Sequence, residues 1–139
     1  QTTNINQYRA HLSPNIGHTI AQLKKLKQVV EENGSIRTRQ ADVIRKLLDE
    51  SPYPLIVCGD FNATPSSYTY RTIKGRLRDS FRDAGKGYGY SYRYLKKLYR
   101  IDYIFYSSEN FRATRYYSPE LEYSDHKPVV VTFDFSPKD

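Results

Sequence analysis

A run of four apolar residues, Leu55-Ile56-Val57-Cys58, constrains the fold of this chain more than any other feature. It stands between Pro54 and Gly59, and a short run that is apolar at every position is typical of a strand covered on both faces. The sequence therefore predicts a central strand of a sheet. Cys58, the single cysteine of the chain, lies in that run and is predicted to be a buried structural thiol.

A polar loop, Gly59-Asp60-Phe61-Asn62, follows this strand directly. Open α/β sheets bind their ligands at the carboxyl ends of strands, so this loop is a candidate site. Asp60 and Asn62 are alternate residues of one extended segment, and we expect their side chains to point the same way. A carboxylate and a carboxamide placed together suit a hard cation or a water held beside a phosphate.

The other elements follow from periodicity and turn residues. Apolar residues at helical spacing predict a helix from His18 to Glu32 that ends at Asn33-Gly34, and a second helix that begins after Ser35 and ends at Ser51-Pro52. Beyond the apolar run we expect a short helix near Tyr68 to Lys74 and four strands: Gly89 to Tyr94, Arg100 to Tyr106, Phe111 to Tyr117 and Pro128 to Phe135. The predicted fold class is α/β (α+β by some schemes), with a mixed, largely antiparallel sheet and helices on one face.

Two further motifs carry chemistry. Asp102 lies inside the apolar strand Arg100-Ile101-Asp102-Tyr103-Ile104, where a carboxylate is costly to bury without a partner. A histidine is a natural partner, and His126 in Ser124-Asp125-His126-Lys127-Pro128 can provide it. Such a pair fixes the imidazole tautomer and favours the imidazolium, which can hold or protonate a phosphoryl oxygen. Asp125, next to His126, is a candidate metal ligand.

Positive charge is concentrated in one segment. Between Arg71 and Arg100 there are ten Lys or Arg against Asp79 and Asp83, so this segment carries +8 and the rest of the chain −1, for a net charge of +7. Seven aromatic residues lie within or beside the same stretch, and this mixture of cations and flat rings suits phosphates and bases. The segment therefore predicts a polyanionic partner, such as nucleic acid. A solvated basic hairpin with half-buried tyrosines, or attraction to an anionic membrane surface, fits the same composition.

The chain has 139 residues, 38% hydrophobic and 27% charged, which is enough for a single domain of ordinary composition over residues 1–139. No apolar run approaches the roughly 18 residues of a membrane span, and no signal-peptide pattern is present. The chain begins with Gln1 and contains no methionine, so we read it as a piece of a longer protein. Its compartment stays open, cytoplasmic or exported.

The motifs Gly59-Asp60-Phe61-Asn62, Arg100-Ile101-Asp102-Tyr103 and Ser124-Asp125-His126-Lys127-Pro128, in this order, resemble those of the endonuclease/exonuclease/phosphatase superfamily of deoxyribonucleases, apurinic endonucleases, inositol phosphatases and sphingomyelinases. The resemblance covers most of the chain, as the carboxy-terminal half of such a domain. It implies half of a four-layered α/β sandwich. It also implies metal-dependent, in-line hydrolysis of a phosphoester, with Mg²⁺, or alternatively Mn²⁺, as cofactor.

By the same resemblance, five positions have roles, and a sixth is assigned more weakly. Asp60 is expected to activate the attacking water, and Asn62 to contact the phosphate or the metal. Asp102 would orient His126 at the phosphate, and Asp125 would help to hold the metal together with Asp60 and Asn62. His11, in His11-Leu12, resembles the histidine of a family strand that contacts the phosphate, although Arg9-Ala10 replaces the residues that usually precede it.

The family's principal metal ligand is a glutamate of the amino-terminal half, and no glutamate of this chain has the expected context. We therefore expect that the missing half carries it, that this half alone has little or no activity, and that its uncovered sheet face packs against the missing half or self-associates. The alternative function is a non-catalytic phosphate- or nucleic-acid-binding module of the same fold.

Overall fold

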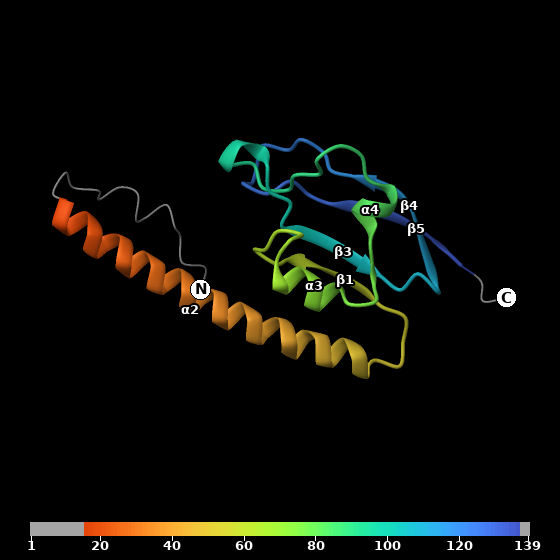
Figure 1. The fold of residues 1–139 in the computed structure, drawn as a ribbon. Coiled ribbons are helices and arrows are strands. Elements are labelled where there is room, and N and C mark those ends of the chain that lie inside the picture. The colour runs from red at the N-terminus through yellow and green to blue at the C-terminus, as the bar shows by residue number, and fades with distance from the viewer. Residues whose placement is uncertain (1–15, 137–139) are drawn as a thin grey trace. The chain divides into compact units, whose positions relative to one another are not determined.

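The computed structural model describes residues 16–136, apart from the side chains at positions 16–20, 22, 23, 30 and 95 (Figure 1). His11 lies outside the described residues. The chain divides into two compact units, Gln1–Arg37 and Thr38–Asp139, and the site and the core described below belong to the second. None of the described helices combines the length and the apolar character that crossing a membrane requires.

The first described helix, α2, is continuous from Ile16 to Glu50, so the predicted break at Asn33-Gly34 is wrong. Gly34 is not among the glycines with a positive φ, and the left-handed conformation that would end the helix is therefore not used. Instead, the Arg37 Nε donates a hydrogen bond to the Asn33 carbonyl one turn back. A glycine inside a helix costs about 1 kcal/mol relative to alanine, which the rest of a 35-residue helix can offset.

Strand β3, Asp102–Tyr106, is the centre of a three-stranded antiparallel sheet. It pairs with β1, Ile56–Asp60, on one side and with the short β2, Arg78–Asp79, on the other. In the described part of the chain β1 therefore lies at an edge, and the prediction of a central strand is wrong. Its side chains alternate between exposed and half-buried, and Cys58 is exposed rather than buried. An apolar run shows that a strand is covered, but it does not show whether a neighbouring strand lies on each side. The run is therefore also compatible with an edge strand.

A second antiparallel pair joins β4, Phe111–Tyr117, to β5, Val130–Phe135. The short helix α3, Tyr68–Lys74, has the predicted bounds and is capped by Ser67, whose side chain accepts from the Tyr70 backbone amide. Helix α4, Ser80–Ala84, lies against β4, and the turn η1, Leu95–Lys97, precedes β3. Figure 1 shows α3 beside the sheet that contains β1 and β3. Helices combined with antiparallel sheets confirm the predicted fold class.

The predicted strand from Gly89 to Tyr94 is wrong. In this segment only Tyr92 forms ladder-type contacts, as isolated bridges to Tyr99 and His126. Gly87 and Gly89 both have positive φ, at 71° and 60°, which turns the backbone away from an extended course. Alternating tyrosines indicated a strand, but the glycines between them determine the local conformation.

The core forms where α2 and α3 meet the three-stranded sheet. Ala41 of α2 is 1% exposed, and Tyr103 and Phe105 of β3 are 2% and 0% exposed. Aromatic rings fill most of this core: Tyr70 meets Tyr103 edge-on, with 5.0 Å between ring centroids. The packing of α2 and α3 on one face of the sheet fixes the position of β3, including Asp102 at its amino-terminal end.

One buried ion pair lies next to this core. Both carboxylate oxygens of Asp79 accept from Arg100 Nη1, at 3.0 and 2.8 Å, and the Tyr70 hydroxyl also donates to Asp79, at 2.7 Å. The Arg100 guanidinium lies 4.6 Å from the Phe81 ring centroid and 4.9 Å from that of Tyr103. Burial and the hydrogen bond to Asp79 raise the pKa of Tyr70 to about 12, so this hydroxyl stays a donor.

We predict that Arg100→Ala lowers the free energy of unfolding by about 3–5 kcal/mol, because it leaves the carboxylate of Asp79 buried without its cation. Urea denaturation followed by circular dichroism measures the change. Arg112, whose ion pair with Asp134 is exposed, gives the matched control: Arg112→Ala should cost at most about 1 kcal/mol. Equal losses in the two variants would contradict the structural role assigned to Arg100.

Candidate functional site

Strand pairing brings two carboxylates together. Asp60 is the last residue of β1 and Asp102 the first of β3, and the antiparallel register places them directly opposite each other. Opposed residues of an antiparallel pair have their side chains on the same face, about 4.5–5.5 Å apart at Cβ. Two opposed carboxylates repel each other, so a cation or a proton donor is needed to stabilise both in their charged form.

His126 supplies that group. Its Nδ1 lies 2.8 Å from Asp102 Oδ2, and its Nε2 lies 3.7 Å from Asp60 Oδ2. His126 reaches this position from the segment before β5, and the ring of Tyr92 packs edge-on against the imidazole with centroids 5.4 Å apart. The predicted Asp102–His126 contact is therefore present, with Asp60 on the other side of the ring.

Opposing effects act on the pKa of His126. Partial burial disfavours the charged ring and would lower this pKa. The hydrogen bond to Asp102 and the negative charges of Asp102, Asp60 and Asp125 act in the other direction and together outweigh burial, so the pKa lies above its ordinary value. The imidazolium is thus favoured, with Nδ1 donating to Asp102.

A buried serine holds the strand end and the histidine segment together. Ser91 is fully buried, and its hydroxyl accepts hydrogen bonds from the backbone amides of Ile101 and Asp102, both at 3.0 Å. Its carbonyl accepts from the Lys127 amide at 2.7 Å. One residue therefore ties the start of β3 to the residue that follows His126. Ser91 was not predicted from the sequence, because a serine between two tyrosines matches no motif.

The loop after β1 is shaped by Asp60 and Asn62. The backbone amide of Asn62 donates to Asp60 Oδ1 at 2.9 Å, and Asn62 has a left-handed φ of 46°. Asparagine tolerates this conformation better than most residues with a side chain, which is a backbone reason for asparagine here. The loop leaves Asp60 half exposed, with 38% of its side chain accessible, so a ligand can reach it.

Around these residues lies an open cavity of about 510 Å³. The carboxylates of Asp60 and Asp102 and a ring nitrogen of His126 offer three ligand atoms within 4.8 Å of one another, close enough for one metal ion. Asp125 is exposed and outside this group; its carbonyl accepts from the Arg93 amide. The roles predicted for Asp125 and Asn62 as ligands stay predictions, as does that of His11.

The amino-acid sequence matches a model of the Endonuclease/Exonuclease/phosphatase family over residues 29–126. No curated protein matches the chain. Among solved structures, the chain is similar to the mannosyl-6-phosphatase of Bacteroides thetaiotaomicron VPI-5482, at 26% identity with a TM-score of 0.57, covering 71% of this chain and 46% of that one. It is also similar to another endonuclease/exonuclease/phosphatase family protein of Bacteroides thetaiotaomicron, at 26% identity and a TM-score of 0.62, covering 75% and 46%.

The catalytic domain of human Nocturnin, solved with a bound sulfate anion, is 26% identical with a TM-score of 0.57, covering 74% of this chain and 42% of that domain. The chain thus spans less than half the length of these structures. The motifs that meet at the site, from Asp60 to His126, lie within the matched residues. Because that match includes most of its residues, the chain belongs to the Endonuclease/Exonuclease/phosphatase family.

Proposed function

We propose that this chain supplies part of the active site of a divalent-metal-dependent phosphoester hydrolase. The observation that carries the proposal is the position of His126 between two carboxylates, 2.8 Å from Asp102 and 3.7 Å from Asp60. Binding a phosphate requires donors or cations, but it does not require a histidine held between two carboxylates. Family membership and the similarity to a mannosyl-6-phosphatase support the same class of reaction.

His126 would act at the phosphate. Asp102 holds Nδ1, which leaves Nε2 as the donor that faces the open cavity beside Asp60. An imidazolium there can donate a hydrogen bond to a phosphoryl oxygen as charge develops on it, which is the part of the reaction that gains most from a fixed donor. Asp102 is a positioning residue in this scheme: it fixes the tautomer and the orientation of the ring.

Asp60 would act on the water. Its Oδ1 accepts a hydrogen bond from the backbone amide of Asn62, and its Oδ2 faces His126. In the proposed step the water oxygen forms a bond to phosphorus in line with the leaving oxygen, the bond from phosphorus to that oxygen breaks, and Asp60 accepts the proton of the water. Asn62 lies on the same loop and would contact the phosphate.

The residues present fit a hard divalent cation. Mg²⁺ is usually held by one or two carboxylates, with waters completing its coordination, and Asp60 offers an accessible carboxylate. Asp60 and Asn62 would hold the ion, with Asp125 as a further ligand. A bound Mg²⁺, or Mn²⁺ in its place, would neutralise charge on the phosphate and polarise the bond to be broken.

We further propose that a longer protein completes this site and covers the outer face of the sheet. Ile56, on the same face of β1 as Asp60, is 44% exposed, and Leu121, which lines the cavity at His126, is also 44% exposed. The chain spans less than half of its structural relatives, so a further part of the protein would be available to cover this face. We expect the remaining metal ligand, a glutamate, to come from that part.

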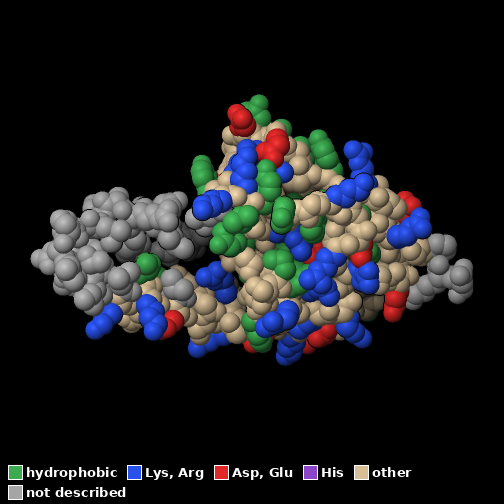
Figure 2. Space-filling view, turned by 45° about the horizontal axis from the view of Figure 1, so that its top comes forward, with side chains coloured by type: hydrophobic (Ala, Val, Ile, Leu, Met, Phe, Trp, Pro, Cys, Tyr) green, Lys and Arg blue, Asp and Glu red, His purple; other side chains and the backbone are tan. Residues whose placement is uncertain are grey.

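Nucleic acid is our proposal for the extended partner. Figure 2 shows Lys and Arg side chains interspersed with hydrophobic ones over one face. Not every cation of the segment from Arg71 to Arg100 is free for a ligand, because Arg100 is buried against Asp79 and Arg78 pairs with Asp83. Affinity for DNA that falls steeply with salt would support this partner, and salt-independent binding would rule it out.

We predict that His126→Ala lowers the rate of phosphodiester hydrolysis by about 10²–10⁴-fold, because the donor at the phosphoryl oxygen is lost. The assay uses bis-(p-nitrophenyl) phosphate with Mg²⁺ or Mn²⁺, on a longer chain that supplies the family's amino-terminal half. Lys46→Gln, an exposed change on α2, is the control and should keep full activity. An inactive unmodified protein would favour the binding-module alternative, whereas a fully active His126→Ala variant would overturn the role assigned to His126.

We predict that Asp60→Asn weakens Mg²⁺ binding by at least about tenfold, because it removes a charged oxygen ligand. Magnesium titration of this chain, followed by the backbone amide resonances of Gly59 and Asn62, measures binding without activity. Asp134→Asn, at an exposed carboxylate of β5, is the control for loss of one negative charge. Unchanged Mg²⁺ affinity in Asp60→Asn would overturn the ligand assignment.

Cys58 reports on the covering of the sheet, because it is the single thiol and is exposed here. We predict that Ellman's reagent labels it in this chain at a rate within about threefold of that in urea. In a longer chain that supplies the family's amino-terminal half, labelling should slow by at least about tenfold, since burial limits access to the thiol. Equal rates in both chains would show that this face stays open.

A further inference from the structure

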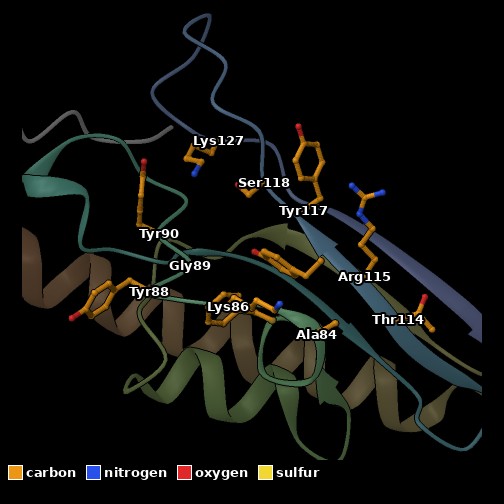
Figure 3. A pocket seen from close by; sticks show the side chains of 12 residues that line it. Ala84, Lys86, Tyr88, Gly89, Tyr90, Thr114, Arg115, Tyr117, Ser118 and Lys127 are labelled. Atoms are coloured by element: carbon orange, nitrogen blue, oxygen red, sulfur yellow. The ribbon is translucent and has the colours of Figure 1, made fainter.

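A second cavity, of about 650 Å³, lies next to the site. Most of its lining comes from two stretches of the chain, residues 81–90 on and after α4 and residues 114–118 on β4 and just beyond it, as Figure 3 shows. Lys127 lines this cavity and also the cavity that holds His126, so the two are neighbours. We refer to it below as the tyrosine pocket, because Tyr88, Tyr90 and Tyr117 line it.

The charges that line the tyrosine pocket are all positive. Lys86, Arg115 and Lys127 contribute to its wall, and no aspartate or glutamate does among the described residues. Lys127 is paired with Glu120 at 3.0 Å, whereas neither Lys86 nor Arg115 forms an ion pair with a described carboxylate. Two cations are therefore available to an anion, and they approach from different stretches of the chain.

The polar groups of the pocket are also incompletely satisfied. The Ser118 hydroxyl is buried and has no hydrogen-bond partner among the described residues. An unpartnered buried hydroxyl is costly, and a turn of the Ser118 side chain toward the cavity would let it donate to a ligand oxygen. The Arg115 guanidinium lies over the Tyr117 ring, 5.4 Å from its centroid, which holds the cation at the wall of the pocket.

Glu120 keeps the wall in place without neutralising the pocket. It accepts from the Tyr90 hydroxyl and from Lys127, and Arg93 Nη1 lies 3.7 Å from it. These hydrogen bonds, from Tyr90 first and then Lys127, lower the pKa of Glu120 to about 2, so it stays charged. Tyr90 and Lys127 are thereby fixed at the boundary between the two cavities, with the Lys127 amine 4.2 Å from the Tyr90 ring centroid.

We propose that the tyrosine pocket binds a second phosphate group of the substrate, joined to the phosphoester that reacts at His126. This inference rests on the proposed function, because the pocket is a substrate site only if the reaction takes place at His126. Lys86 and Arg115 bind the second phosphate, and the exposed ring of Tyr88 offers a flat surface for the group that links the two phosphates. The substrate is therefore a molecule with at least two phosphates, either a nucleic-acid strand or a small bisphosphate.

Inorganic phosphate tests the pocket directly. Titration of this chain, followed by the backbone amide resonances of Gly89 and Ser118, should show saturable binding. The double variant Lys86→Gln/Arg115→Gln should raise the dissociation constant at these amides by at least about fivefold and leave the response of Gly59 within about twofold. The matched control, Lys46→Gln/Arg76→Gln, removes two exposed charges elsewhere and should change neither response by more than about twofold.

Two outcomes would overturn the proposal: no phosphate response at Gly89 and Ser118, or an undiminished response in the double variant. Oligothymidylates of increasing length then identify the source of the second phosphate. If a nucleic-acid strand occupies the pocket, affinity should rise with oligonucleotide length. In the double variant this rise should be smaller, and the slope of log affinity against log salt concentration should fall by about one. Phosphate binding without any dependence on length assigns it to a small bisphosphate.

The outcomes separate this proposal from the proposed function. Phosphate binding at the pocket, combined with no hydrolysis by the unmodified longer protein, would keep the pocket and overturn the hydrolase. Hydrolysis that depends on His126, with no phosphate response at Gly89 and Ser118, would keep the hydrolase and overturn the pocket.

Discussion

The antiparallel pairing of β1 with β3 is the constraint on which the site depends. Because the register places Asp60 opposite Asp102, the two carboxylates share one face of the sheet at one end of both strands. A slip of one residue would turn one of them to the other face and separate them. Strand β3 cannot slip easily, since Tyr103 and Phe105 are locked in the aromatic core and the buried side chain of Arg100 is held by Asp79.

Buried polar contacts extend this order from the sheet to the histidine. Ser91 accepts from the amides of Ile101 and Asp102 and is itself tied to Lys127 through its carbonyl. The segment that carries His126 is therefore fixed to β3 by the backbone and not by the imidazole alone. The proposed role of His126 as a donor requires such support, because a displacement of about 1 Å is enough to weaken catalysis greatly.

Cations that are adjacent in the sequence have different surroundings in the structure. Of the ten cations between Arg71 and Arg100, some stabilise the protein: Arg100 is buried with Asp79, and Arg78 and Arg93 pair with Asp83 and Glu120. The tyrosine pocket combines Lys86 from this segment with Arg115 and Lys127 from outside it. Charge density along the sequence therefore indicates an anionic partner, whereas the place of binding depends on which cations remain unpaired after folding.

The sequence by itself determined the family, the fold class, the bounds of α3 and β4, and the contact of Asp102 with His126. These depend on local patterns and on motif order: a carboxylate in an apolar strand requires a partner, and a histidine motif follows in the chain. The tertiary structure decided that α2 runs through Asn33-Gly34, that β1 lies at an edge with Cys58 exposed, and that Tyr92 forms isolated bridges instead of a strand. It also decided the part played by Ser91 and the tyrosine pocket. The physical reason is that burial, strand neighbours and the pairing of charges are set by residues distant in sequence, which no local pattern contains.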